Sequence, residues 1–124
     1  MIGSVQCVVL DCPNGPVLAR FYRSLLGGEI NRPDPRWAVD DHFSTLHTES
    51  GLVLGFQRIR DFRAPQWPDY AHPQQFHLDV DVPDLDEAHA RLLELGSTLL
   101  HVDSRGWRVY ADPVGHPFCL LQAR

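Results

Sequence analysis

The sequence predicts an α+β fold in which one plan, a strand, a helix and three strands, occurs twice. Three observations carry this prediction. Residues 75–96 alternate polar and apolar side chains as a strand does and continue directly with helical spacing. Residues 5–27 repeat this succession, and each copy is followed by three further stretches of strand character. We therefore expect two βαβββ modules, at 1–57 and 75–124, joined by an arm at 58–74 within a single domain.

The first module begins with residues 5–11, whose β-branched side chains favour a strand. A Cys-Pro-Asn-Gly-Pro run then separates this strand from a helix that extends to about residue 26. The helix has an apolar stripe for burial and is ended by Gly27 and Gly28. The stripe consists of Val17, Leu18, Phe21, Tyr22 and Leu25. The strands expected to follow are residues 28–31, 43–47 and 51–57.

The second module opens with a strand whose apolar and polar side chains face opposite ways. The apolar row is Phe76, Leu78 and Val80, and the polar row is His77, Asp79 and Asp81. A helix follows, capped by Asp84 with Glu87 and ended by Gly96. Its expected buried stripe is Leu85, Ala88, Leu92 and Leu95. Because the apolar row should pack under this helix, His77 and Asp79 should point to the other side of the sheet. The remaining strands are expected at residues 97–102, 107–111 and 115–121.

The two modules can be aligned with each other. Setting Cys7 over His77 brings Pro13 onto Pro83, and the closing strands then align with Gly55 over Cys119.

The arm contains three prolines together with Trp67 and Tyr70, which excludes a regular helix or a central strand. Two interpretations are open for these aromatic side chains. They fasten the arm to its own domain, or they serve a subunit contact or a pocket lid.

Composition narrows the classes of function. The chain has 124 residues and a net charge of −5 with scattered basic residues, so a nucleic-acid partner is not expected. Its three cysteines form no CxxC pair, and no signal peptide or bilayer-spanning stretch is present. We expect a soluble, cytoplasmic protein with reduced thiols.

Three segments carry a resemblance to a known superfamily. They are LARFYRSLLGGE at residues 18–29, FHLDVDVPDLDEAHARLLELG at 76–96 and DPVGHPFCLL at 112–121. With these the chain resembles the glyoxalase/bleomycin-resistance/dioxygenase, or vicinal oxygen chelate, superfamily, and within it a glyoxalase-like branch of small bacterial proteins. The resemblance implies that the two modules form a curved, mostly antiparallel sheet around a cavity. It also implies a homodimer, which the aromatic and proline content of the arm favours.

Metal-dependent members of this superfamily take four ligands from the first and last strands of the modules. Carried onto this chain, the four positions are Cys7, Gly55, His77 and Cys119, and only His77 matches. Gln57, on the same strand face as Gly55, offers only a neutral amide oxygen. We therefore expect no cofactor and no metal isomerase of the glyoxalase I type. A divalent metal (zinc, nickel or iron) is the alternative, held by Cys7, His77 and Cys119 as a Cys₂His set with an open fourth position.

Several residues are candidates for a site, each with a plainer structural alternative. His77 with Asp79 is the catalytic candidate, and the alternative is a histidine that is satisfied structurally. Cys7 and Cys119 are either ligands or small apolar fillers, whereas Cys12 lies on the opposite strand face. Trp37, Trp107, Arg108 and Tyr110 are further contact candidates; Trp107 shares a strand face with Val109, and the pattern leaves open which face is inward. The other histidines, His42, His47, His72, His89, His101 and His116, are expected on the surface or in loops.

The most favoured function is binding of a small organic molecule in the sheet cavity without the usual metal centre. The predicted ligand-binding residues are Cys7, Gly55, Gln57, His77, Trp107 and Cys119. Two alternatives remain open: a metal-dependent lyase, isomerase or dioxygenase, and a metal-free enzyme with His77 as general base.

Overall fold

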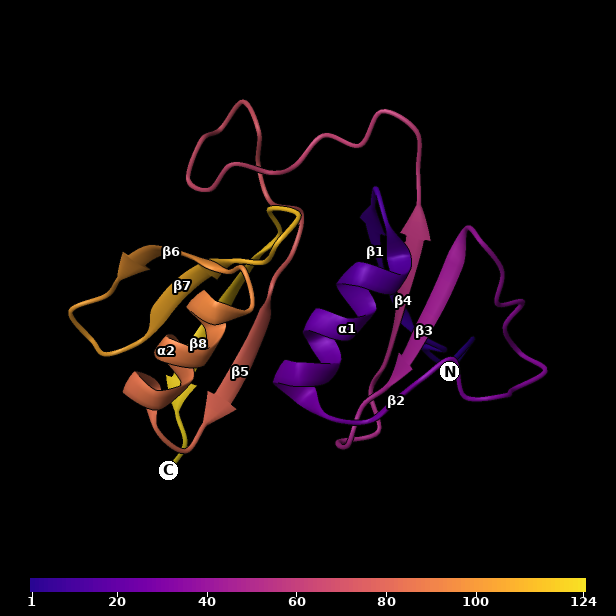
Figure 1. Ribbon diagram of the computed structural model, residues 1–124, viewed down its shortest axis with the longest axis horizontal. Helices are drawn as coiled ribbons and strands as arrows, with labels where there is room; N and C mark the ends of the chain where they lie inside the picture. The colour runs from indigo at the N-terminus through magenta and orange to yellow at the C-terminus, as the bar shows by residue number, and fades with distance from the viewer. The chain divides into compact units, whose positions relative to one another are not determined.

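A computed structural model describes residues 1–124. The chain forms two compact units, Met1–Phe62 and Arg63–Arg124. Each unit contains one helix and a four-stranded mixed sheet (Figure 1). The α+β class and the two βαβββ modules predicted from the sequence are confirmed.

The first unit contains β1 (Val8–Cys12), α1 (Gly15–Leu26), β2 (Glu29–Ile30), β3 (Phe43–His47) and β4 (Val53–Arg58). Its sheet has the order β1-β4-β3-β2, in which β1 and β4 are parallel and the other pairs antiparallel. The second unit contains β5 (Leu78–Val82), α2 (Leu85–Glu94), β6 (Thr98–Val102), β7 (Arg108–Ala111) and β8 (Pro117–Gln122). Its order, β5-β8-β7-β6, is the same with the same directions.

Helix α1 begins where the sequence indicates. The Asn14 side chain accepts a hydrogen bond of 3.1 Å from the Val17 backbone N–H, which satisfies one of the free donors of the first turn. Leu18 and Tyr22 are fully buried, and Tyr22 stacks on Phe56 of β4 with ring centroids 5.9 Å apart. Val17, by contrast, is 41% exposed, so its predicted place in the buried stripe is wrong. It lies in the first turn at the edge of the stripe.

Helix α2 is capped as predicted, since Asp84 accepts a hydrogen bond of 2.9 Å from the Glu87 N–H. Its stripe is narrower than predicted, because only Leu92 is buried. Leu85 and Ala88 are half-buried. Leu95 is exposed, because the helix stops at Glu94 and leaves it at the cap.

Strand β5 also begins later than the alternation suggests. Phe76 and His77 precede it, Phe76 is exposed, and Leu78 is only half-buried. The reason is position, because β5 is an edge strand of its sheet and Leu78 is its first residue. The prediction that Phe76 and Leu78 are core residues is therefore wrong, and the buried residues under α2 are Val82, Tyr110, Phe118 and Leu120.

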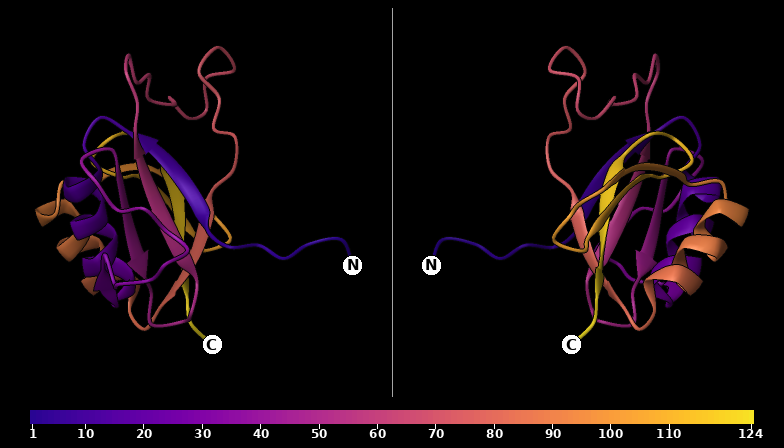
Figure 2. Two further views of the ribbon diagram at one scale, coloured as in Figure 1. Left: turned by 90° about the vertical axis from the view of Figure 1, so that its right-hand side faces the viewer. Right: turned by 90° about the vertical axis from the view of Figure 1, so that its left-hand side faces the viewer.

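The helix of each unit covers one face of its own sheet (Figure 2). We call the other face, which is turned away from that helix, the far face. In β5 and β8 the residues of this face include Asp79 and Cys119, which are direct partners in the parallel pairing. Val9 and Gly55 are paired in the same way in β1 and β4. The register thus agrees with the alignment of Cys7 with His77 and of Gly55 with Cys119.

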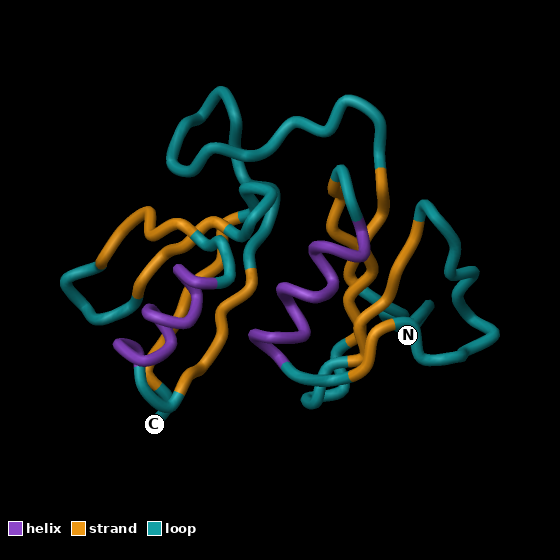
Figure 3. The backbone as a smooth tube through the Cα atoms, in the orientation of Figure 1, coloured by secondary structure: helices purple, strands orange, loops and turns teal.

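After Arg58, which ends β4, the arm contains no helix or strand (Figure 3). Trp67 and Tyr70 of the arm behave differently. Trp67 packs against His101 of β6 with ring centroids 5.7 Å apart, whereas Tyr70 is 98% exposed. Trp67 therefore fastens the arm to its own unit, and Tyr70 does not. No helix in the structure has the length and apolar character required to cross a membrane.

Candidate functional site

A pocket of about 290 Å³ lies on the far face of the second unit. It is lined by His77, Asp79, Trp107, Cys119 and Leu121. Four of these residues were candidates from the sequence. Leu121 was not, although its place two residues after Cys119 puts it on the same strand face.

Strand pairing brings the polar residues of the pocket together. Asp79 of β5 stands opposite Cys119 of β8, and His77 lies two residues before Asp79 and shares its direction. One potential ligand atom from each of these three side chains lies within 4.8 Å of the others. The three therefore form one cluster, which we call the polar cluster.

Alternation along β7 decides which of its faces belongs to the pocket. Trp107 lies immediately before β7 and lines the pocket. Arg108 faces α2, where it donates hydrogen bonds to the Leu85 carbonyl (3.2 Å) and to the Asp86 carboxylate (2.6 Å). Tyr110 is buried on that side with Phe118. Arg108 and Tyr110 thus support the helix instead of lining the pocket.

The polar cluster is held by contacts to Asp79. Its Oδ1 lies 3.3 Å from His77 Nε2, and the two side chains are 61% and 40% exposed. Burial, and then the negative charge of Asp79 and a hydrogen bond to it, raise the pKa of the Cys119 thiol to about 11. Near neutral pH the thiol is therefore protonated and donates to Asp79.

Trp107 supplies an apolar wall of the pocket, and its ring is in contact with a cation. The Arg105 guanidinium lies 4.1 Å from the centre of the Trp107 ring. Arg105 is in turn paired with Asp103 at 2.9 Å, and hydrogen bonds from Arg105 hold the pKa of Asp103 at about 2. The carboxylate thus orients the guanidinium, which makes a cation–π contact with the indole.

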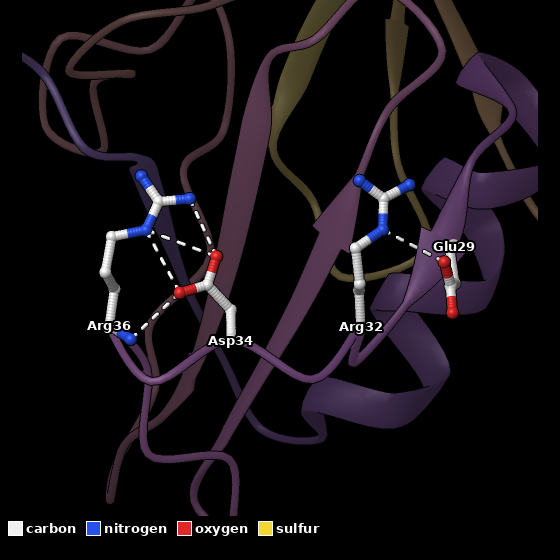
Figure 4. A network of polar contacts seen from close by, with 4 residues as sticks. All are labelled: Glu29, Arg32, Asp34 and Arg36. Carbon is white, nitrogen blue, oxygen red and sulfur yellow. Dashed lines mark hydrogen bonds and ion pairs between the residues drawn. The ribbon is translucent and has the colours of Figure 1, made fainter.

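The first unit repeats this arrangement. Asp34 pairs with Arg36 at 2.7 Å (Figure 4). Arg36 also stacks over Trp37 at 4.4 Å. Hydrogen bonds from Arg36 lower the pKa of Asp34 to about 2. In both units this Asp–Arg–Trp group lies between the second and third strands. We did not foresee it from the sequence, although the two similar spacings, DPRW and DSRGW, are a visible signal.

On the far face of the first unit, side chains lie close against Gly55. A Cβ atom at Gly55 would stand 2.7 Å from Phe43 Cζ and 3.2 Å from Val9 Cγ2, so the Phe43 ring occupies the space. The Gln57 amide donates to the His42 carbonyl at 3.1 Å. Cys7 is half-buried just before β1.

These observations test whether the residues fit the metal centre that the superfamily implies. Gly55 contributes no donor, and Phe43 fills its place. The Gln57 amide is engaged in a backbone contact. The four-position ligand set therefore does not fit this chain. The structure instead brings His77, Asp79 and Cys119 together, so that Asp79 and not Cys7 is the third donor beside His77 and Cys119.

Two histidines that were expected on the surface or in loops are structural. His47 of β3 is only 6% exposed and touches the Trp37 ring edge-on. His89 of α2 shares a hydrogen bond of 2.9 Å with the Tyr110 hydroxyl. A second, polar pocket of about 480 Å³ in the first unit is lined in part by His47, Glu29 and Arg32, the last two being paired at 3.0 Å (Figure 4).

Two βαβββ modules with the same strand order agree with the vicinal oxygen chelate superfamily that the sequence resembles. The family described as "Glyoxalase-like domain" matches residues 7–121. The chain belongs to this family. No curated protein matches the chain.

Solved structures share the fold at low sequence identity. Hypothetical protein SA1046 from S. aureus superimposes with a TM-score of 0.69 at 19% identity, over 99% of each chain. The fosfomycin resistance protein FosX from Mesorhizobium loti gives 0.71 at 10% identity, over 100% of this chain and 94% of that one. A glyoxalase/bleomycin resistance protein/dioxygenase family enzyme from Burkholderia phytofirmans PsJN gives 0.67 at 16%, over 95% and 97%. Similarity at this level establishes the fold and not the reaction.

Proposed function

We propose that the protein binds a small organic molecule in the far-face pocket of its second unit, and that it does so without the four-ligand metal centre. The observation that carries the proposal is the composition of the pocket walls. Trp107 and Leu121 offer apolar contact, while His77 and Asp79 offer hydrogen bonds to one end of a ligand. A concave apolar surface with a few polar anchors is the usual form of a small-molecule site.

The size of the pocket limits the ligand. At about 290 Å³ it lies near the lower end of ordinary ligand pockets. The protonated Cys119 and an imidazole N–H are donors, and the Asp79 carboxylate is an acceptor. These features favour a compact molecule that has one aromatic or aliphatic part and one polar end.

The proposal is tested by isothermal titration of chelator-treated protein with a panel of compact aromatic and aliphatic carboxylic acids, amines and alcohols. We expect at least one saturable ligand whose binding is lost in His77→Ala and Trp107→Ala. His72→Ala is the matched control, because His72 is a similarly exposed histidine paired with Asp69 in the arm. No saturable ligand, or binding that survives both pocket substitutions, would reject the proposal.

One further observation favours a second candidate, a metal-free enzyme. His77 and Asp79 are within pairing distance, so the carboxylate can fix the tautomer of the ring and leave the other nitrogen as a base. We expect an acidic carbon of a bound compound to exchange its hydrogen for deuterium in D₂O, and NMR detects this exchange. This exchange should disappear in His77→Gln while binding of the compound persists; exchange that continues in His77→Gln would eliminate His77 as the base.

A further inference from the structure

The polar cluster combines three kinds of side chain that commonly bind metal ions in proteins. It brings a nitrogen, an oxygen and a sulfur donor within 4.8 Å of one another, from two neighbouring strands of one sheet. His77 and Asp79 are partly exposed, so an ion has access from solvent. Their positions are set by the pairing of Asp79 with Cys119 and by the two-residue spacing of His77 from Asp79.

The spacing suits a small tetrahedral ion. Zinc bonds to nitrogen, oxygen and sulfur are about 2.0–2.3 Å long, so two donors in a tetrahedral site stand roughly 3.3–3.7 Å apart. His77 Nε2 and Asp79 Oδ1 are already 3.3 Å apart. The widest separation in the cluster, up to 4.8 Å, would close by about 1 Å through side-chain rotation.

The mixture of donors selects the kind of ion. Magnesium and calcium prefer oxygen ligands throughout, so an imidazole and a thiolate make a poor site for them. Histidine nitrogen with cysteine sulfur and one carboxylate suits zinc and similar borderline ions. Three protein ligands also leave one position open, and in this pocket Trp107 and Leu121 line the space beside it.

We propose that His77, Asp79 and Cys119 bind one divalent ion of the zinc class, entirely within the second unit. No ligand from Cys7 or Gly55 is needed, which separates this site from the four-position pattern of the superfamily. The inference goes beyond the proposed binding of an organic molecule, and it does not depend on it. The ion lies at the polar end of the pocket, and Cys119 gives up its thiol proton to solvent when the ion binds.

Cobalt(II) is the probe, because it takes zinc sites and reports a bound thiolate through a charge-transfer band in the near ultraviolet. The full chain is purified without a metal-affinity tag, treated with chelator and titrated with cobalt. We expect the band to saturate at one ion per chain and to vanish when zinc is added. Cys119→Ser should remove the band, and His77→Ala and Asp79→Asn should each weaken cobalt binding by at least about 10-fold.

Two control variants accompany these. Asp81→Asn changes the next carboxylate on the same strand face, outside the cluster, and Cys12→Ser changes a buried cysteine of the first unit. Both should bind cobalt as the unmodified chain does. The near-ultraviolet circular dichroism of each variant establishes that it is folded.

The proposal is overturned if no thiolate band forms at one equivalent of cobalt. It is also overturned if the band persists in Cys119→Ser, or if Cys7→Ser removes it, because the sulfur would then come from the first unit. Organic ligands are tested on chelator-treated protein, so a failure of either proposal is distinguishable from a failure of the other.

Discussion

In the first unit Tyr22 stacks on Phe56 at 5.9 Å, and in the second Tyr110 stacks on Phe118 at 5.7 Å. Each pair is buried on the helix side of its sheet, yet one tyrosine comes from a helix and the other from a strand. The two units thus reach the same kind of core with different residues. Packing on this side tolerates substitution as long as apolar volume is kept.

The far faces of the two units differ far more. Around Gly55 the first unit has the Phe43 ring and Thr45, whereas the corresponding place in the second unit holds the polar cluster. One unit has filled this space with an apolar ring, and the other has left it open to solvent beside Trp107. The comparison teaches that helix-side packing maintains the fold, and that far-face chemistry is free to diverge between the copies.

The largest loss of stability is expected for substitutions in the apolar core on the helix side of each sheet. Leu54→Ala and Leu120→Ala, one in each unit, remove fully buried leucines and should each lower the free energy of unfolding by ~2–5 kcal/mol. Urea denaturation measures the loss. The control on the far face is His77→Ala, which should cost ~1 kcal/mol or less because the side chain is partly exposed. Equal losses for Leu120→Ala and His77→Ala would break the distinction between the two faces.

A smaller loss of stability is expected when a methyl group is added at Gly55, where Phe43 covers the far face of the first unit. Gly55→Ala should cost ~1–3 kcal/mol in the free energy of unfolding, since the new methyl group meets Phe43 and Val9. The same denaturation series on Phe43→Leu with Gly55→Ala should recover most of that loss. If the double variant is no more stable than Gly55→Ala, Phe43 does not occupy the space that we assign to it.

The smallest effect concerns the two Asp–Arg–Trp groups. Arg36→Gln and Arg105→Gln should raise the pKa values of Asp34 and Asp103, respectively, from about 2 toward the ordinary 3.8. A folded-state pKa below the unfolded value means that each pair stabilises the fold above pH ~4 and loses this contribution as the pH falls through about 2. Carboxyl ¹³C NMR titration measures the shift. An unchanged pKa in either variant would show that the arginine is not its cause.

Most of the fold was predictable because helices and strands leave periodic patterns in the sequence. The alternation at His77 to Asp81, the Pro-Asn-Gly-Pro break before α1 and the cap at Asp84 predicted the right elements in the right order. The errors fall at element ends, as with Phe76 before β5 and Leu95 after α2. An edge position or a cap removes burial that the periodicity alone suggests.

The site was predictable only in part. Aligning the modules placed His77 and Cys119 together, because parallel pairing keeps such positions in register. The alignment also marked Cys7 and Gly55 as site positions. It could not show that the Phe43 ring covers Gly55. That contact, like those of Trp107 with Arg105 and of His47 with Trp37, depends on side-chain packing that strand alternation does not encode.

All five residues that line the pocket of the second unit come from the last 48 positions of the chain, from His77 onward. A single module therefore supplies every side chain of the pocket. Exchange of modules between two copies of the chain, or recombination of this module with an unrelated first partner, would carry the imidazole, the carboxylate, the thiol and the indole along together. Selection can thus act on the chemistry of one module while the other drifts.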